Sequence, residues 1–182
     1  MQNAILFCIL IYMIAILNGI RSMHNVGSIF RTADAAGIEK IYLCGITPAP
    51  KDKFGEWRPQ IAKVALGAEK YIPWEKVGSC VSLIKKLKTQ GYKIFALEQH
   101  KNSTPYYRIK MSKRSLKKTA FVVGNEVNGL SPEILGLADK ILEIPMRGAM
   151  VRSANHPRHT GRGKESLNVA VAFGVVTLHF AR

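Results

Sequence analysis

Short apolar runs alternate with longer stretches of mixed polarity along most of this chain. The apolar runs are Ile9–Leu17, Ile41–Leu43, Ile94–Leu97, Ala120–Val123 and Ile141–Ile144. Continuous apolar runs of this length are typical of strands with both faces covered, as in a parallel sheet. The stretches between them are long enough for helices. The pattern therefore predicts an α/β fold, with a mostly parallel sheet flanked by helices.

Two of the intervening stretches carry residues that begin or end helices. Asn25 can cap a helix that runs to Ala36, with Gly37 after it. Ser131 and Pro132 supply an N-cap and a proline at the first helical position. We therefore predict one helix that begins near Asn25 and another that begins at Pro132.

The C-terminal stretch from about Leu167 to Phe180 carries apolar residues on most faces of a helix. We expect this helix to be largely buried, in the protein or in a subunit interface, and Ser166 can be its N-cap. A further helix is predicted over Val81–Lys88, before Gly91. No repeat, low-complexity linker or break in composition divides the 182 residues, so residues 1–182 are expected to form a single domain.

The N-terminal apolar run from Ala4 to Leu17 has more than one interpretation. It is shorter than the roughly 20 residues that span a bilayer as a helix, and it lacks the positively charged n-region of a signal peptide. We favour a buried strand with a few extra apolar residues, Ala4–Cys8, in front of it, and we expect no membrane partner. A membrane-anchored protein is the alternative.

Cysteine and histidine usage does not indicate a disulfide framework or a metal site. Cys8, Cys44 and Cys80 form an odd set in which no pair has the spacing of metal ligands. We interpret them as reduced thiols of a cytoplasmic protein. His156 and His159 lack a third ligand nearby, so no metal is expected there.

The charge of the chain favours a polyanionic partner. Its 27 Lys and Arg against 12 Asp and Glu give a formal net charge of +15. Such a charge favours binding of polyanions, because each phosphate that the protein neutralises releases its condensed counterions. RNA, DNA and anionic membranes all fit this charge. Two basic regions, Lys101–Lys118 around Tyr106 and Tyr107, and Ala149–Gly163, can lie along an RNA backbone. Solvated loops whose lysines confer solubility are the alternative.

Three segments carry candidate chemistry. In the first, Asn25 and Arg31 follow the first predicted strand and lie at the start of a helix. This would place both near the carboxyl edge of the sheet, where α/β folds bind ligands. In the second, Gly124 lets a ligand approach the backbone after a strand, and Glu126 can orient a hydroxyl or an amino group. A capped helix with a surface arginine, and an ordinary strand-to-helix turn, explain the same residues without a ligand.

The third segment has two parts, a strand end with proline and the start of the final helix. Together, and in this order, the three segments resemble the signature motifs of the SpoU (TrmH-like) family, in the SPOUT class of methyltransferases. The motifs are Ile20-Arg21-Ser22 with Asn25–Arg31, then Gly124-Asn125-Glu126, then Ile144-Pro145-Met146 with Ser166-Leu167-Asn168. The resemblance extends from about Ile9 to Phe180.

The resemblance implies a fold that ends in a deep trefoil knot, one of the few exceptions to the rule that chains do not thread. It also implies binding of S-adenosylmethionine in that knot, a homodimer with the site near the interface, and methylation of a ribose 2′-hydroxyl of tRNA or rRNA. The cofactor-binding residues that it implies are Leu97, Gly124, Ile144, Met146 and Leu167. A catalytically idle RNA-binding protein of the same fold, and a methyltransferase of tRNA bases, are the alternatives.

By the same resemblance, Arg31 is the residue closest to the hydroxyl proton. Arginine is a poor base because its pKa exceeds about 12, so contact with phosphate or stabilisation of the developing alkoxide is physically easier. The residues expected to position Arg31, the ribose or the cofactor are Asn25, Glu126, Ser166 and Asn168.

The third motif departs from the pattern of the family. Removing residues 149–163 would rejoin Arg147-Gly148 to Lys164-Glu165-Ser166 and restore the usual spacing, so we interpret these residues as an insertion. It can act as a lid or as an added RNA contact, since loops tolerate length at modest entropic cost, or it can disturb the cofactor pocket. We also expect this protein to act without the small RNA-recruiting domain of many larger family members, so that the catalytic domain, its dimer or a partner selects the substrate.

Overall fold

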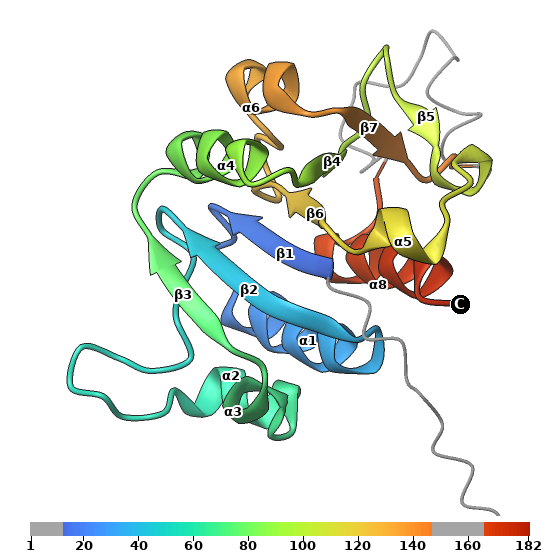
Figure 1. The fold of residues 1–182 in the computed structure, drawn as a ribbon. Helices are drawn as coiled ribbons and strands as arrows, with labels where there is room; N and C mark the ends of the chain where they lie inside the picture. The colour runs from blue at the N-terminus through green and yellow to red at the C-terminus, as the bar shows by residue number, and fades with distance from the viewer. Residues whose placement is uncertain (1–12, 147–165) are drawn as a thin grey trace, which may run out of the picture.

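The structure, a computed structural model, describes residues 13–146 and 166–182, and all statements of structure below refer to these residues. Their strands form one sheet in the order β3-β2-β1-β6-β4-β7-β5, and every neighbouring pair is parallel. The strands are β1 (Met13–Asn18), β2 (Ile38–Cys44), β3 (Trp74–Val77), β4 (Lys93–Leu97), β5 (Thr104–Pro105), β6 (Thr119–Val123) and β7 (Lys140–Glu143). The predicted α/β fold with a parallel sheet is confirmed (Figure 1).

Helices cover both faces of this sheet. They are α1 (Met23–Ala35), α2 (Pro59–Ala65), α3 (Ala68–Tyr71), α4 (Cys80–Thr89), α5 (Lys113–Leu116), α6 (Pro132–Leu137) and α8 (Val169–Phe180), with a 3₁₀ turn, η1 (Tyr106–Arg108). Helices α1 and α8 pack on one face, and α4 and α6 on the other. None of the helices within the described part of the chain is long and apolar enough to cross a membrane.

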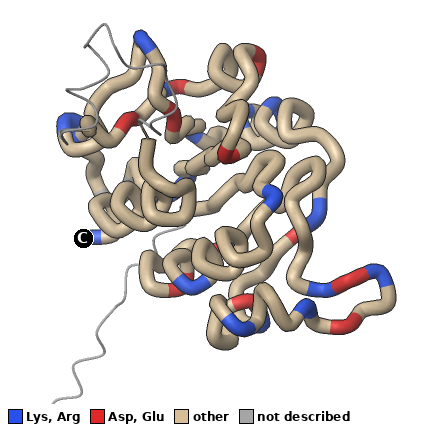
Figure 2. The backbone as a smooth tube through the Cα atoms, turned by 180° about the vertical axis from the view of Figure 1, so that it is seen from behind, with Lys and Arg blue, Asp and Glu red and all other residues tan. Residues whose placement is uncertain are grey.

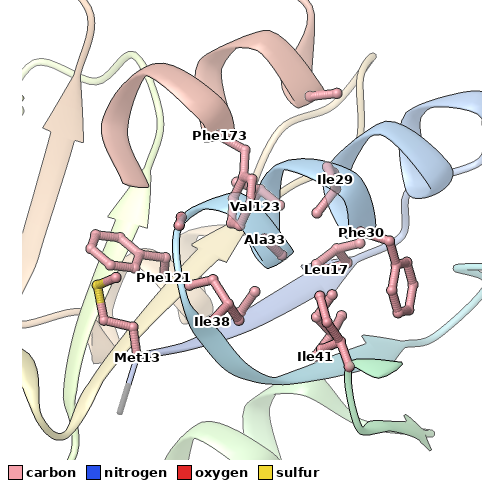
Figure 3. Packing of buried hydrophobic residues seen from close by; sticks show 14 of the residues in the cluster. Met13, Leu17, Ile29, Phe30, Ala33, Ile38, Ile41, Phe121, Val123 and Phe173 are labelled. Carbon is pink, nitrogen blue, oxygen red and sulfur yellow. The ribbon is translucent and has the colours of Figure 1, made fainter. Parts of the chain in front are cut away.

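The central strands bury both of their faces, as their continuous apolar character predicts. In β1, Ala15 and Leu17 belong to the core on the α1 and α8 side, and Ile14 and Ile16 belong to the core on the α4 and α6 side. Figure 3 shows Leu17 and Phe173 among the side chains that fill the first of these cores. The sheet is therefore the middle layer of three.

Strands β3 and β5 were not predicted from the sequence. β3 is only partly buried at the edge of the sheet, and β5 has two residues next to β7. Edge strands need apolar residues on fewer positions, so neither has the continuous apolar run of a central strand. The predicted first strand is present as β1, whereas its first residues and the extra apolar residues Ala4–Cys8 lie outside the described part of the chain.

Two predicted helix caps were wrong, and both corrections matter for the site. Ser22 caps α1, because its hydroxyl accepts a hydrogen bond from the amide of Asn25 at 3.2 Å. Asn168, and not Ser166, caps α8 by accepting from the amide of Ala170 at 2.9 Å. The side chain of Asn25 is thereby left available for contacts beyond its own helix. Ser131 caps α6 as predicted.

Helix α8 is buried on one face only within this chain. Phe173, Val176 and Phe180 belong to the core, but Val171, Val175 and Leu178 are 52%, 37% and 41% exposed. The latter three lie four and three residues apart, which places them on one side of the helix. Among the described residues, α8 is therefore buried on one side only, whereas the sequence predicts a helix that is largely buried in the protein or in a subunit interface.

Candidate functional site

A cavity of about 270 Å³ opens at the carboxyl ends of β4, β6 and β7. Next to it the chain changes direction across the sheet: it runs outward from β1 through β2 to β3, and β4 then lies on the far side of β6. Parallel α/β sheets bind ligands at such switch points. The cavity is lined by Leu97, Glu98, Gln99, Val123, Gly124, Asn125, Glu126, Val127, Gly129, Leu142, Glu143, Ile144, Ser166, Leu167, Asn168, Val169, Ala172 and Val176.

The ionisable side chains of this lining are all acidic. Glu98 follows β4, Glu126 lies in the loop after β6, and Glu143 ends β7. Neither lysine nor arginine occurs among the described residues of the lining. In a chain with a net charge of +15, this arrangement favours a ligand that carries positive charge beside its apolar parts.

A hydrogen-bonded network joins all three sequence motifs at the mouth of the cavity. Asn25 Nδ2 donates to Glu126 Oε1 at 2.9 Å, and Asn25 Oδ1 accepts from Asn168 Nδ2 at 3.1 Å. A carboxylate can only accept hydrogen bonds, so Glu126 fixes which end of the Asn25 amide faces it. Asn168 is oriented in turn, because its Oδ1 caps α8. The network therefore couples the start of α1, the loop after β6 and the start of α8.

The turn between β1 and α1 is held from two sides. The buried hydroxyl of Thr47 donates to the carbonyl of Leu17 at 3.0 Å and accepts from the amide of Ile20 at 3.1 Å. Asn125 Nδ2 donates to the carbonyl of Gly19 at 2.8 Å. These bonds fix the approach of α1 to the loop after β6, and so position Asn25.

The same network sets the ionisation of Glu126. Burial by itself would raise the pKa of this carboxyl, but the hydrogen bonds from Asn25 and from the backbone amides of Glu126, Arg21 and Ser22 together hold its pKa below its ordinary value of 4.5. The ionised form is therefore favoured in the folded state. Its contribution to stability is present above the pKa of the unfolded chain and is lost as the pH falls through the lower pKa of the folded state.

Replacing Asn25 with alanine is expected to raise the pKa of Glu126, because burial remains and the side-chain hydrogen bond is lost. The change can be measured by NMR titration of the ¹³C-labelled glutamate carboxyl groups. Asn168→Ala is the matched control: it removes the hydrogen bond to Asn25 Oδ1 and the cap of α8, but no hydrogen bond to Glu126, so it should leave the pKa of Glu126 nearly unchanged. Equal titration curves for the wild type and Asn25→Ala would contradict this account.

The loop after β6 is closed by close backbone packing. Asn125 and Gly129 form an antiparallel bridge, and the amide of Leu130 donates to Glu98 Oε2 at 2.9 Å. A Cβ atom on Gly124 would lie 2.6 Å from the carbonyl carbon of Gly129. The sequence interpretation assigned Gly124 to the approach of a ligand, whereas the structure shows that it also lets the two ends of this loop meet.

Most of the sequence-predicted site residues gather at this cavity. Those in its lining are Leu97, Gly124, Glu126, Ile144, Ser166, Leu167 and Asn168. Asn25 lies just outside and reaches it through Glu126, while Met146 is half-buried and not part of the lining. Glu98, Glu143 and Asn125 were not predicted as site residues. The available signal was their position, because polar residues at the carboxyl ends of parallel strands face the ligand edge of the sheet.

Arg31 is not brought to the cavity. It lies on α1, six residues or about 9 Å of helix beyond Asn25, and its side chain is exposed. The expectation that Arg31 and Asn25 project together at the carboxyl edge is therefore met only by Asn25. The basic region at residues 149–163, interpreted as an insertion, lies outside the described residues, as do His156 and His159.

Comparison with known proteins places this fold and site in a family. The sequence profile of the SpoU rRNA Methylase family matches residues 12–156, so the chain belongs to this family. A tRNA (guanosine(18)-2′-O)-methyltransferase from Aquifex aeolicus (strain VF5) is 32% identical over 164 residues, which make up 90% of this chain and 66% of that protein. The chain spans between 50% and 66% of the length of the first curated relatives that it matches.

Solved structures agree with this assignment. The A. aeolicus TrmH/SpoU tRNA modifying enzyme matches with a TM-score of 0.71 at 30% identity, over 94% of this chain and 74% of that chain. An AdoMet-bound rRNA methyltransferase from Sinorhizobium meliloti matches with a TM-score of 0.74 at 27% identity, over 94% of this chain and 56% of that chain.

Proposed function

We propose that this chain transfers a methyl group from S-adenosylmethionine to a ribose 2′-hydroxyl of tRNA or rRNA. The observation that carries the proposal is the acid-lined cavity at the switch point of the sheet, where all three motifs meet. The names of the relatives support it: one methylates a guanosine 2′-oxygen of tRNA, and another is an rRNA methyltransferase bound to AdoMet.

The described residues of the cavity fit this cofactor. S-adenosylmethionine combines a flat adenine ring with a positively charged sulfonium and an amino-acid end that carries both an ammonium and a carboxylate group, so its net charge is positive. Leu97, Ile144 and Leu167 supply apolar walls, and Glu98 and Glu143 supply negative charge. The volume of about 270 Å³ lies just below the roughly 300–1,000 Å³ of typical small-molecule sites. The apolar residues would hold the adenine ring, and the carboxylates would face the sulfonium and ammonium groups.

When bound, the cofactor supplies an activated methyl group, and its sulfonium leaves as a neutral thioether. The protein must align the ribose oxygen in line with the methyl carbon, exclude water and assist loss of the hydroxyl proton. Glu126, Asn25 and Asn168 hold the edge of the cavity where the ribose would enter. Arg31 contacts the RNA phosphate or stabilises the negative charge that develops on the 2′-oxygen.

Arg31 would act in a homodimer. The exposed apolar side of α8, formed by Val171, Val175 and Leu178, is a suitable interface. Helix α8 packs directly on α1, since Gly174 lies against Thr32, the neighbour of Arg31. A second copy on this side would therefore come close to Arg31, and its cavity could receive the arginine that does not reach the cavity of its own chain.

The remaining proposals concern the chain as a whole. We propose a single methyltransferase domain over residues 1–182 with an insertion at 149–163, a C-terminal trefoil knot, and a cytoplasmic location. Support for the knot comes from Ser166–Asn168, which line the cavity beside the loop after β6, where the family resemblance places the tucked segment. The partner is a structured RNA, which the net charge of +15 favours.

Transfer of labelled methyl groups from S-adenosylmethionine to undermodified tRNA and rRNA tests the proposed function. Nucleoside digestion of the product is expected to give a 2′-O-methyl nucleoside. A methylated base would instead support the tRNA-base methyltransferase. Binding of RNA without any affinity for the cofactor would contradict the enzyme and support the catalytically idle RNA-binding protein.

A further inference from the structure

A well-defined hairpin follows β2 and presents an exposed aromatic ring beside lysines. Lys51 and Trp57 form an antiparallel bridge, and we call residues 51–58 the Lys51–Arg58 hairpin. Asp52 Oδ1 accepts from the amides of Phe54 at 2.8 Å and Glu56 at 3.0 Å. The backbone of the tip is thereby fixed by hydrogen bonds, and the hairpin projects from the molecule to the left of α2 in the view of Figure 1.

The tip of the hairpin exposes the aromatic ring of Phe54. Its side chain is 77% exposed, and the ammonium group of Lys53 lies 4.9 Å from the centre of the ring. At this exposure the ring buries little apolar surface in the fold and is open to contact with a ligand. The arrangement suits a ligand that stacks on an aromatic ring and carries negative charge close to the stacked group.

Two further lysines lie next to the ring of Trp57 at the base of the hairpin. The ammonium group of Lys51 lies 4.7 Å from its ring centre and that of Lys70 lies 5.8 Å from it. Around the hairpin, Lys51, Lys53, Lys70 and Arg58 outnumber the acids Asp52 and Glu56. One oxygen of Asp52 already accepts two backbone hydrogen bonds. Figure 2 shows these basic and acidic positions along the hairpin.

The position of the hairpin relates it to the cavity. The hairpin follows the carboxyl end of β2, and the cavity lies at the carboxyl ends of β4, β6 and β7 in the same parallel sheet. Both therefore emerge from one edge of the sheet, with only β1 between β2 and β6. Figure 1 shows that the hairpin then projects away from the sheet beside α2, so a large RNA whose ribose enters the cavity would meet the hairpin with a part remote from that ribose.

We infer that the Lys51–Arg58 hairpin binds RNA by stacking an unpaired base on Phe54, while Lys53 and the lysines around Trp57 contact the adjoining phosphates. This inference rests on the proposed function, because it takes RNA as the partner. Base stacking on aromatic side chains combined with a basic surface is the usual means of binding single-stranded nucleic acid. Bases that are free to stack occur in loops and bulges of structured RNA.

The inference is tested with the full chain by fluorescence anisotropy, using a labelled single-stranded RNA and the same strand in a duplex. Phe54→Ala is expected to weaken binding of the single strand by about ten-fold, equivalent to about 1.4 kcal/mol, with a much smaller effect on the duplex. Phe54→Trp keeps an aromatic face and should retain binding.

Lys53→Ala should weaken binding of both the single strand and the duplex, and lower the salt dependence of binding by about one phosphate contact. Because Phe54 is so exposed, the melting temperature should not change.

Tyr107→Ala is the comparison variant, since Tyr107 is 45% exposed in the other basic region with tyrosines. If Tyr107→Ala weakens binding of the single strand and Phe54→Ala does not, the inference is overturned. It is also overturned if Phe54→Ala impairs only binding to phosphatidylglycerol vesicles. Unchanged RNA binding by Phe54→Ala alongside normal methyl transfer by the wild type would refute the hairpin and leave the proposed function intact. If Phe54→Ala weakens RNA binding but the wild type transfers no methyl group, the hairpin is supported and the proposed function is refuted.

Discussion

Replacing Arg31 with alanine is expected to lower the rate of methyl transfer by about 10²–10³-fold, the usual loss when a group that stabilises developing charge is removed. The fold should not be affected, because the Arg31 side chain is exposed. The rate is measured with labelled S-adenosylmethionine over a range of RNA concentrations, which gives both kcat and KM. Stability is measured by thermal unfolding, and cofactor affinity by calorimetry, and neither should change.

The kinetic constants then separate the two roles open to Arg31. A fall in kcat with little change in KM indicates that the guanidinium acts on the developing oxyanion, whereas a rise in KM for RNA indicates contact with phosphate. Lysine keeps the positive charge of arginine but not its two parallel N–H donors. Arg31→Lys should therefore retain activity if Arg31 contacts phosphate through charge alone, and lose it if the contact is bidentate. Lys85→Ala, which removes an exposed cation from α4 on the opposite face of the sheet, is the matched control. Equal losses in the Lys85 and Arg31 variants would mean that only overall charge matters.

Gly124→Ala is expected to destabilise the protein by about 1–3 kcal/mol, the typical cost of forcing an extra methyl group into a packed site. The added Cβ would lie 2.6 Å from the carbonyl carbon of Gly129, 2.7 Å from its oxygen and 2.8 Å from the amide nitrogen of Leu130. These are backbone atoms and cannot rotate away. The loop would open, the hydrogen bond from Leu130 to Glu98 would be strained, and affinity for S-adenosylmethionine would fall.

Gly136→Ala provides the matched control for this substitution. Gly136 lies in α6, and an added Cβ would meet nothing within 4 Å. Alanine is favoured over glycine in a helix interior by roughly 0.5–1 kcal/mol, so this variant should be slightly more stable and bind the cofactor as the wild type does. Urea unfolding and calorimetry measure both quantities. If Gly124→Ala were as stable as Gly136→Ala, the loop would not be packed as closely as the structure indicates. If the two variants bound the cofactor equally well, the packing of the loop would not limit cofactor binding.

The candidate site was predictable wherever sequence order and strand position fix the outcome. Leu97, Gly124 and Ile144 end or follow predicted central strands, and the parallel sheet brings those ends to one edge. The start of α8 was found through the motif that contains Ser166. Its actual cap, Asn168, was not predicted as such, because serine and asparagine, here two residues apart, both favour caps and only the backbone conformation selects between them.

Contacts between distant segments could not be obtained in this way. Glu126 and Asn25 are 101 residues apart, and Asn168 and Asn25 are 143 apart. Sequence spacing carries no information about which end of an amide meets which partner. The wrong assignment of Asn25 as a helix cap had a local origin. Ser22, three residues earlier, caps α1 instead, and this leaves the side chain of Asn25 free to bind Glu126.

The sequence by itself determined the α/β class, the central strands, the basic character of the chain and the family, because these depend on local apolar runs, composition and ordered motifs. The tertiary structure alone decided that the cavity is acidic, that Asn25 joins three motifs, that Arg31 stays outside the cavity of its own chain, and that Phe54 is displayed at the tip of an ordered hairpin. Each of these depends on where the backbone directs a side chain relative to segments far away in the sequence, which residue type and periodicity do not encode.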